Sequence, residues 1–97
     1  MQYPVYNLNG DRPEELVIVY RNAWRALEDA MTTLHRTAPN ARNWQTTSTP
    51  REFVLAQQEH CARLDALARL QVDMRELAKH AQKHARRVQE AHNVPPV

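Results

Sequence analysis

The sequence predicts an all-α protein: an antiparallel hairpin of two long helices with an extended N-terminal arm, assembled into an oligomeric bundle. Apolar residues recur every three or four positions through residues 12–37 and 50–92, which is the spacing of one face of an α-helix. Proline, asparagine, threonine and serine gather between them, in residues 38–49, and these residue types favour a loop. At 97 residues the chain is short enough to form one domain.

Residues 1–10 hold a proline, two asparagines and the only glycine of the chain, a composition that predicts an extended arm. Tyrosine, valine and leucine side chains give this arm apolar area with which to lie against a helix. The first helix has a start signal in Asp11, Pro13 and Glu14, with Asp11 as the N-cap. We expect helix 12–37 to begin there.

The second helix has a capping-box signal, with Thr49 at the cap, Pro50 at the first helical position and Glu52 at the third. We expect this helix at 50–92, followed by a short tail at 93–97. Its apolar residues form a heptad-spaced column, as in a coiled coil. The column consists of Phe53, His60, Leu67, Met74, Ala81 and Val88.

The two predicted helices differ in length, so their pairing leaves apolar surface uncovered. We expect Leu34 to lie beside Phe53 near the loop. Antiparallel pairing then brings Asp11 or Arg12 opposite about Arg75 and leaves some seventeen residues of the second helix, roughly 25 Å, without a helical partner in the same chain. The first helix also has an apolar face wider than one partner helix covers. We therefore expect a second copy of the chain, in a homo-oligomer, or the N-terminal arm to cover the remainder.

Composition argues against several classes of function. The formal net charge is only +2, and the single cysteine, Cys61, is interpreted as a structural residue beside the apolar column. There is no secretory signal and no apolar segment of the roughly 20 residues that span a bilayer, so we expect a cytoplasmic protein without membrane contact. An activated nucleophile and a glycine-rich phosphate loop are absent, so we expect no enzyme activity, no cofactor and no metal. The helix-spaced charges Arg25 and Asp29 are interpreted as a solvated face.

Two sets of residues are candidate ligand contacts. The loop set places guanidinium groups, an indole and an amide within one short connection, which suits stacking of a base and binding of a phosphate. The second set is a basic run near the C-terminus, which suits phosphate contacts. The loop set comprises Arg36, Arg42, Asn43 and Trp44, and the basic run comprises Lys79, Lys83, Arg86 and Arg87.

Both sets also have a purely structural interpretation. Trp44 would close the open end of the hairpin while asparagine and threonine satisfy the turn backbone. Cations near the C-terminal end of a helix stabilise the helix macrodipole. The sequence leaves both interpretations open.

The loop sequence APNARNW, followed by EHCARLDALARLQVDMRELAKH on a long helix, resembles small uncharacterised bacteriophage proteins whose loop often reads PNGRDY. The likeness covers about residues 24–82, with Ala41 where glycine is usual and Asn43 where aspartate is usual. The residues carried over are Pro39, Asn40, Arg42 and, as an aromatic equivalent, Trp44. The resemblance implies a phage accessory protein, a class that includes inhibitors of host immunity.

We hypothesise a non-enzymatic phage accessory protein that sequesters an anionic ligand, a nucleotide-type immune signal, or blocks a host defence protein. One alternative is a structural or interaction module that docks a partner through the apolar helix seam around Leu77, Ala81 and Val88. Another is a DNA-binding regulator, although the sequence offers no compact helix-turn-helix pattern and little net charge for contact with nucleic acid.

Overall fold

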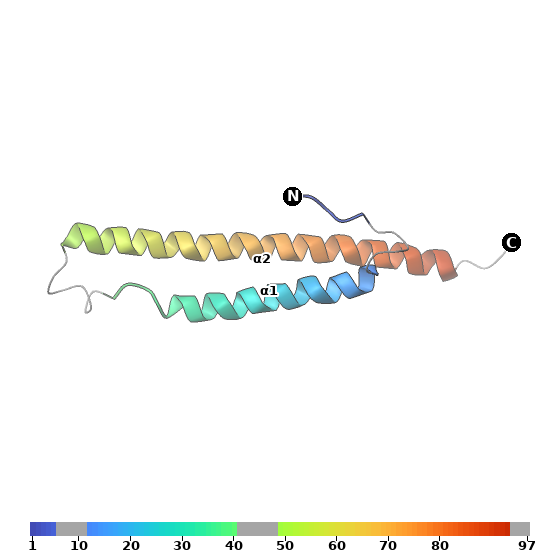
Figure 1. Ribbon diagram of the computed structural model, residues 1–97, viewed down its shortest axis with the longest axis horizontal. Helices are drawn as coiled ribbons and strands as arrows, with labels where there is room; N and C mark the ends of the chain where they lie inside the picture. Colours follow the sequence, from blue (N-terminus) through green and yellow to red (C-terminus); the bar gives the residue numbers. More distant parts are fainter. Residues whose placement is uncertain (6–11, 41–48, 94–97) are drawn as a thin grey trace.

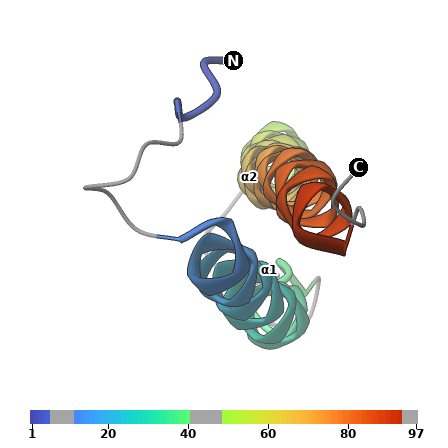
Figure 2. The same cartoon turned by 90° about the vertical axis from the view of Figure 1, so that its right-hand side faces the viewer.

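The computed structural model describes residues 1–5, 12–40 and 49–93 of the chain. These segments contain two helices, α1 (Pro13–His35) and α2 (Pro50–Asn93), and no strand. The helices run in opposite directions side by side, so the expected helical hairpin is confirmed (Figures 1 and 2). Both helices begin and end within two residues of their predicted limits.

The molecule is a rod. Its principal extents are 79 × 21 × 20 Å and its radius of gyration is 21.2 Å, whereas a compact chain of this length has a radius of gyration of about 13 Å. Seen end-on, the two helices form a single layer (Figure 2). No helix within the described residues is long and apolar enough to cross a bilayer.

The start of α2 is capped as the sequence predicts. The backbone N–H of Glu52 donates to Thr49 Oγ1 at 3.2 Å, and the backbone N–H of Thr49 donates to Glu52 Oε2 at 3.0 Å. The Thr49 carbonyl accepts from the Phe53 N–H at 3.2 Å. This reciprocal pair is a capping box, and it fixes where the long helix begins.

The start of α1 differs from the prediction. The N-cap is Arg12, with extended backbone angles (φ −69°, ψ 145°) and no side-chain cap, while the predicted cap, Asp11, lies outside the described residues. Pro13 occupies the first helical turn, and a proline disfavours helical geometry in the residue before it. The N-cap is therefore residue 12, one position later in the chain than predicted.

The described start of the connection, residues 36–40, does not form a tight hairpin turn. After His35 the chain makes short-range turn hydrogen bonds, including Thr37 N–H to the Leu34 carbonyl at 2.9 Å. Residues 37–40 then run beside α2 and share with it a shallow cavity of about 280 Å³, lined on the α2 side by Ala56, Glu59 and Arg63. The first turns of α2 therefore extend past the end of α1 (Figure 1).

This connection changes the helix register. Gln71 Nε2 donates to the Trp24 carbonyl at 3.4 Å and to Glu28 Oε2 at 2.7 Å, so these residues lie opposite each other. Extending this register places Leu34 opposite about residue 64 of α2, so the predicted contact between Leu34 and Phe53 is wrong. At the other end, only about eight residues of α2, some 12 Å, extend past Pro13.

The interior between the helices is narrow. Its buried apolar residues are Val17, Ala78 and Ala81, and Ala81 is completely buried. Two polar side chains, His60 and Gln71, are also buried. Ala81 was expected to lie on an exposed seam, and it is covered because the corrected register brings α1 over this part of α2.

The N-terminal arm contacts α2 in part. Residues 1–5 form neither helix nor strand, and the ring centroid of Tyr3 lies 4.6 Å from that of His80 at an interplanar angle of 31°. The prediction that the arm lies against a helix is confirmed for this residue. The remainder of the arm, residues 6–11, is outside the described part of the chain.

Candidate anion-binding groove

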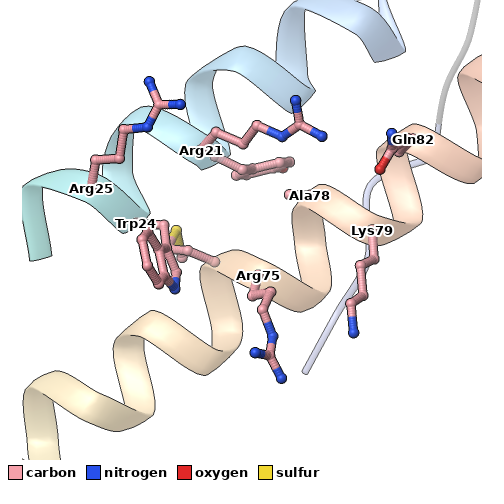
Figure 3. Close-up of a pocket in the computed structure, with 9 residues that line it drawn as sticks. Arg21, Trp24, Arg25, Arg75, Ala78, Lys79 and Gln82 are labelled. Atoms are coloured by element: carbon pink, nitrogen blue, oxygen red, sulfur yellow. The ribbon is translucent and has the colours of Figure 1, made fainter. Parts of the chain in front are cut away.

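A cavity of about 360 Å³ lies between the two helices beside the middle of α1 (Figure 3). Both helices contribute to it, so it exists only because the hairpin closes in this register. We call this cavity and its rim the basic groove. Its lining residues are Tyr20, Arg21, Trp24, Arg25, Met74, Arg75, Ala78, Lys79 and Gln82.

The floor of the basic groove is apolar and partly aromatic. Tyr20, Trp24 and Met74 are half-buried and Ala78 is buried. The Trp24 indole projects from α1 toward α2 (Figure 3). Because the indole is only half-buried, part of its ring remains available to a ligand.

The rim of the basic groove carries four cations. Arg21 and Arg25 extend from α1, and Arg75 and Lys79 extend from α2, with the charged ends of the two pairs pointing away from each other (Figure 3). The nine lining residues include no aspartate or glutamate, so three arginines and one lysine give the lining a formal charge of +4.

One carboxylate approaches the rim from the same helix. Glu76 Oε1 lies 3.7 Å from Lys79 Nζ, and the two side chains are 40% and 58% exposed. Such a solvent-exposed ion pair contributes little and is readily exchanged for another anion. On α1, Glu28 Oε2 accepts a hydrogen bond from Gln71 Nε2.

A simple repeat in the sequence builds the groove. Each helix carries two apolar–basic dipeptides four residues apart: Tyr20–Arg21 and Trp24–Arg25 on α1, and Met74–Arg75 and Ala78–Lys79 on α2. Residues four apart share one helix face. The apolar members therefore face the partner helix, and the basic members follow one step around the helix at the rim.

The predicted ligand contacts are not brought together. Lys79 lines the groove, whereas Arg36 lies just after the opposite end of α1. Lys83 and Arg86 are exposed and continue the basic column of Arg75 and Lys79 by helical spacing, and Arg87 is exposed on the same helix. The other predicted contacts, Arg42, Asn43 and Trp44, lie outside the described residues.

The structure also corrects two interpretations of single residues. Arg25, expected on a solvated face, lines the groove. Cys61, expected to be a small buried hydrophobe, is exposed, because it follows the buried His60 and so points about 100° away from the interface. Among the described residues, no group of three histidine, cysteine or acidic side chains could hold a metal ion.

The chain matches no protein-family model, no curated protein and no solved structure. The geometry of the basic groove therefore carries the functional conclusion.

Proposed function

We propose that this protein binds, without transforming it, an anionic ligand that has a flat apolar part, of the nucleotide type. The observation that carries the proposal is the basic groove itself, an apolar and aromatic floor bordered by four cations with no carboxylate among its lining residues. Its volume of about 360 Å³ falls at the lower end of the range for small-molecule sites.

The two parts of the groove suit the two parts of such a ligand. Guanidinium groups bind phosphate oxygens through paired, charge-assisted hydrogen bonds, and Arg21, Arg25 and Arg75 supply three of them. A base can stack on the exposed part of Trp24, because every base offers a π-face to an aromatic side chain.

The residue types in the groove favour binding over catalysis. The lining residues include no serine, threonine, cysteine, histidine or carboxylate, which leaves Tyr20 and Lys79 as the groups that could act as a nucleophile or a general base. If the chain is a phage accessory protein, the ligand it would sequester is a nucleotide-type signal of host immunity.

Calorimetric titration with ATP and cyclic AMP tests the proposal, with pyrophosphate and adenosine as probes of the two halves. We expect Arg75→Gln to weaken nucleotide binding about tenfold or more, the effect of losing one charge-assisted hydrogen bond of roughly 1.5–3 kcal/mol. Arg69→Gln is the matched control, because Arg69 is an exposed arginine of the same helix outside the groove. Absence of binding to both nucleotides would refute the nucleotide form of the proposal.

The loop residues provide a second comparison. If Arg42→Gln and Trp44→Ala abolish nucleotide binding while Arg75→Gln leaves it unchanged, the ligand site lies at the loop and the groove proposal is wrong. If Arg75→Gln alone weakens binding, the groove holds the ligand.

A protein-interaction module is the second candidate function. Large apolar side chains are exposed on both helices, a feature that marks contact surfaces when such side chains gather in one patch. The exposed ones on the helices are Ile18, Val19, Val54, Leu55, Leu70, Val72 and Val88. Retention of a purified host defence protein on the immobilised chain, lost on substitution of these residues but not of Arg75, would favour this candidate.

A further inference from the structure

The charges of α2 are unevenly distributed along its length. Residues 50–76 carry four arginines and five carboxylates, whereas residues 77–89 carry four cations and no aspartate or glutamate. The last turn of the helix, residues 90–93, contains Glu90 and neither lysine nor arginine. Because the effect of the helix macrodipole falls off within the last turn, stabilisation of the helix end does not explain the cations that precede it.

Two of these cations continue a column that begins in the basic groove. Arg75 and Lys79 line the groove and project from the same side of α2 (Figure 3). Lys83 follows Lys79 by four residues and Arg86 follows Lys83 by three, so both stay on that side of the helix. From Arg75 to Arg86 the column rises by about 16 Å within a sector of roughly 80°. We call these four residues the basic column.

The basic column is accessible along its whole length, because all four side chains are exposed. Lys79 pairs with Glu76 at 3.7 Å, and among the described residues the other three members form no ion pair. The register set by Gln71 brings Glu14 of α1 level with Lys83. Glu14 forms no ion pair with the column, and its position in the first turn of α1 places its charge at the positive end of that helix.

Two aromatic side chains border the basic column. Trp24 is half-buried and lines the groove together with Arg75 (Figure 3). Tyr3 of the arm, 44% exposed, packs on His80, the residue next to Lys79. A row of cations beside aromatic rings is the composition with which proteins bind single-stranded nucleic acids, because the cations follow the backbone and the bases stack on the rings. A purely acidic polymer would use the cations alone.

We propose that the ligand of the basic groove is a single-stranded nucleic acid whose backbone continues from the groove along the basic column. This inference rests on the proposed function, because one base occupies the groove and stacks on Trp24. The phosphates that follow along the strand contact Lys79, Lys83 and Arg86 in turn. A duplex fits this arrangement less well, because its bases are paired and not free to stack on an aromatic ring.

Calorimetric titration of the full chain with an oligothymidylate of about ten nucleotides tests the inference, a length within the range of single-strand binding sites. Thymidine 5′-monophosphate is the matched short ligand, because it fits the groove without reaching the far end of the column. We expect the oligothymidylate to bind at least tenfold more tightly at low salt. The logarithm of its association constant should fall with the logarithm of salt concentration with a slope of up to about −3, since each neutralised phosphate of a single strand contributes about −0.7.

Lys83→Gln and Arg86→Gln distinguish the column from the groove. Each should weaken binding of the oligothymidylate about two- to fivefold, the effect of losing one exposed charge contact, and should make the salt slope shallower by about 0.7. Neither should change binding of thymidine 5′-monophosphate. Arg69→Gln is the matched control, because it removes the same charge from an exposed position of α2 outside the column, and it should change neither affinity. Circular dichroism verifies that each variant remains helical.

The outcomes separate this inference from the proposed function. If mononucleotides bind while the oligothymidylate binds no more tightly, or if Lys83→Gln and Arg86→Gln leave its binding unchanged, the inference is wrong and the proposed function stands. Equal affinity for a duplex of the same length, or for polyglutamate of the same charge, also overturns the inference, because neither offers unpaired bases. Absence of binding to the mononucleotides and to the oligothymidylate refutes both.

Discussion

Replacement of His60 by leucine should stabilise this protein. His60 is 6% exposed and sits in the heptad column of α2, where the neighbouring Glu59 and Arg63 face residues 37–40. Its Nε2 atom is buried and has no hydrogen-bond partner among the described residues. An apolar side chain at this position would remove a polar atom from surroundings that do not satisfy it.

The expected gain is about 1 kcal/mol. A buried donor or acceptor without a partner costs roughly 1–3 kcal/mol, and a volume-conserving change to an apolar side chain typically costs less than about 1.5 kcal/mol in packing. Leucine is also a slightly better helix former than histidine. For a domain of this size, a gain of 1 kcal/mol corresponds to a rise in Tm of about 4–8 °C.

Urea unfolding followed by circular dichroism measures the effect, with the chain concentration held constant because assembly changes apparent stability. The urea concentration at the midpoint of unfolding should rise, while the dependence of the unfolding free energy on urea concentration stays the same. His35→Leu is the control, because His35 is exposed at the end of α1 and loses no buried group. A loss of stability of 1 kcal/mol or more in His60→Leu would show that the imidazole has a partner, and would refute the reasoning.

Three further changes test how the hairpin is held together, each by urea unfolding. Thr49→Ala removes one half of the capping box and should cost about 1 kcal/mol, whereas Arg12→Asp supplies the cap that α1 lacks and should gain some tenths to 1 kcal/mol; the same sign for both would contradict the capping analysis. Gln71→Ala removes the hydrogen bonds to Trp24 and Glu28 and should cost about 1–2 kcal/mol, and an unchanged midpoint would mean that these bonds contribute nothing. Ala81→Leu inserts volume at a completely buried site and should cost about 1–3 kcal/mol; tolerance of leucine would show that the helices are further apart than the structure has them.

Local signals in the sequence predicted the helices well. Thr49, Pro50 and Glu52 mark the start of α2 through contacts within four residues, and the structure contains these contacts. The heptad column was correct for most of its length, because His60 and Ala81 are buried, whereas Val88 at its end is 38% exposed. Signals of this kind depend only on neighbouring residues along one helix, which is why they can be read without the fold.

The register could not be read in the same way. It depends on the path of residues 36–49, and a tight corner was assumed because proline and asparagine favour turns. The structure instead runs residues 37–40 along α2, which moves the pairing by roughly three turns of helix. No local pattern in the sequence encodes that path.

The basic groove was missed as a consequence. Arg21 and Arg25 appear as ordinary surface charges until the register places Arg75 and Lys79 across the interface from them. The repeated apolar–basic dipeptide on both helices was the available signal. Its meaning requires the pairing of α1 with α2, because each helix alone contributes only half of a groove.

The register is therefore the central claim, since the basic groove depends on it, and chemical cross-linking tests it most directly. In a Cys61→Ser background, cysteines replace Glu28 and Gln71, whose side chains meet at 2.7 Å, and the short thiol cross-linker dibromobimane is added. We expect rapid cross-linking within one chain for this pair and little for cysteines at positions 28 and 59, which a tight hairpin would bring together. Efficient cross-linking of positions 28 and 59, with none between 28 and 71, would contradict it.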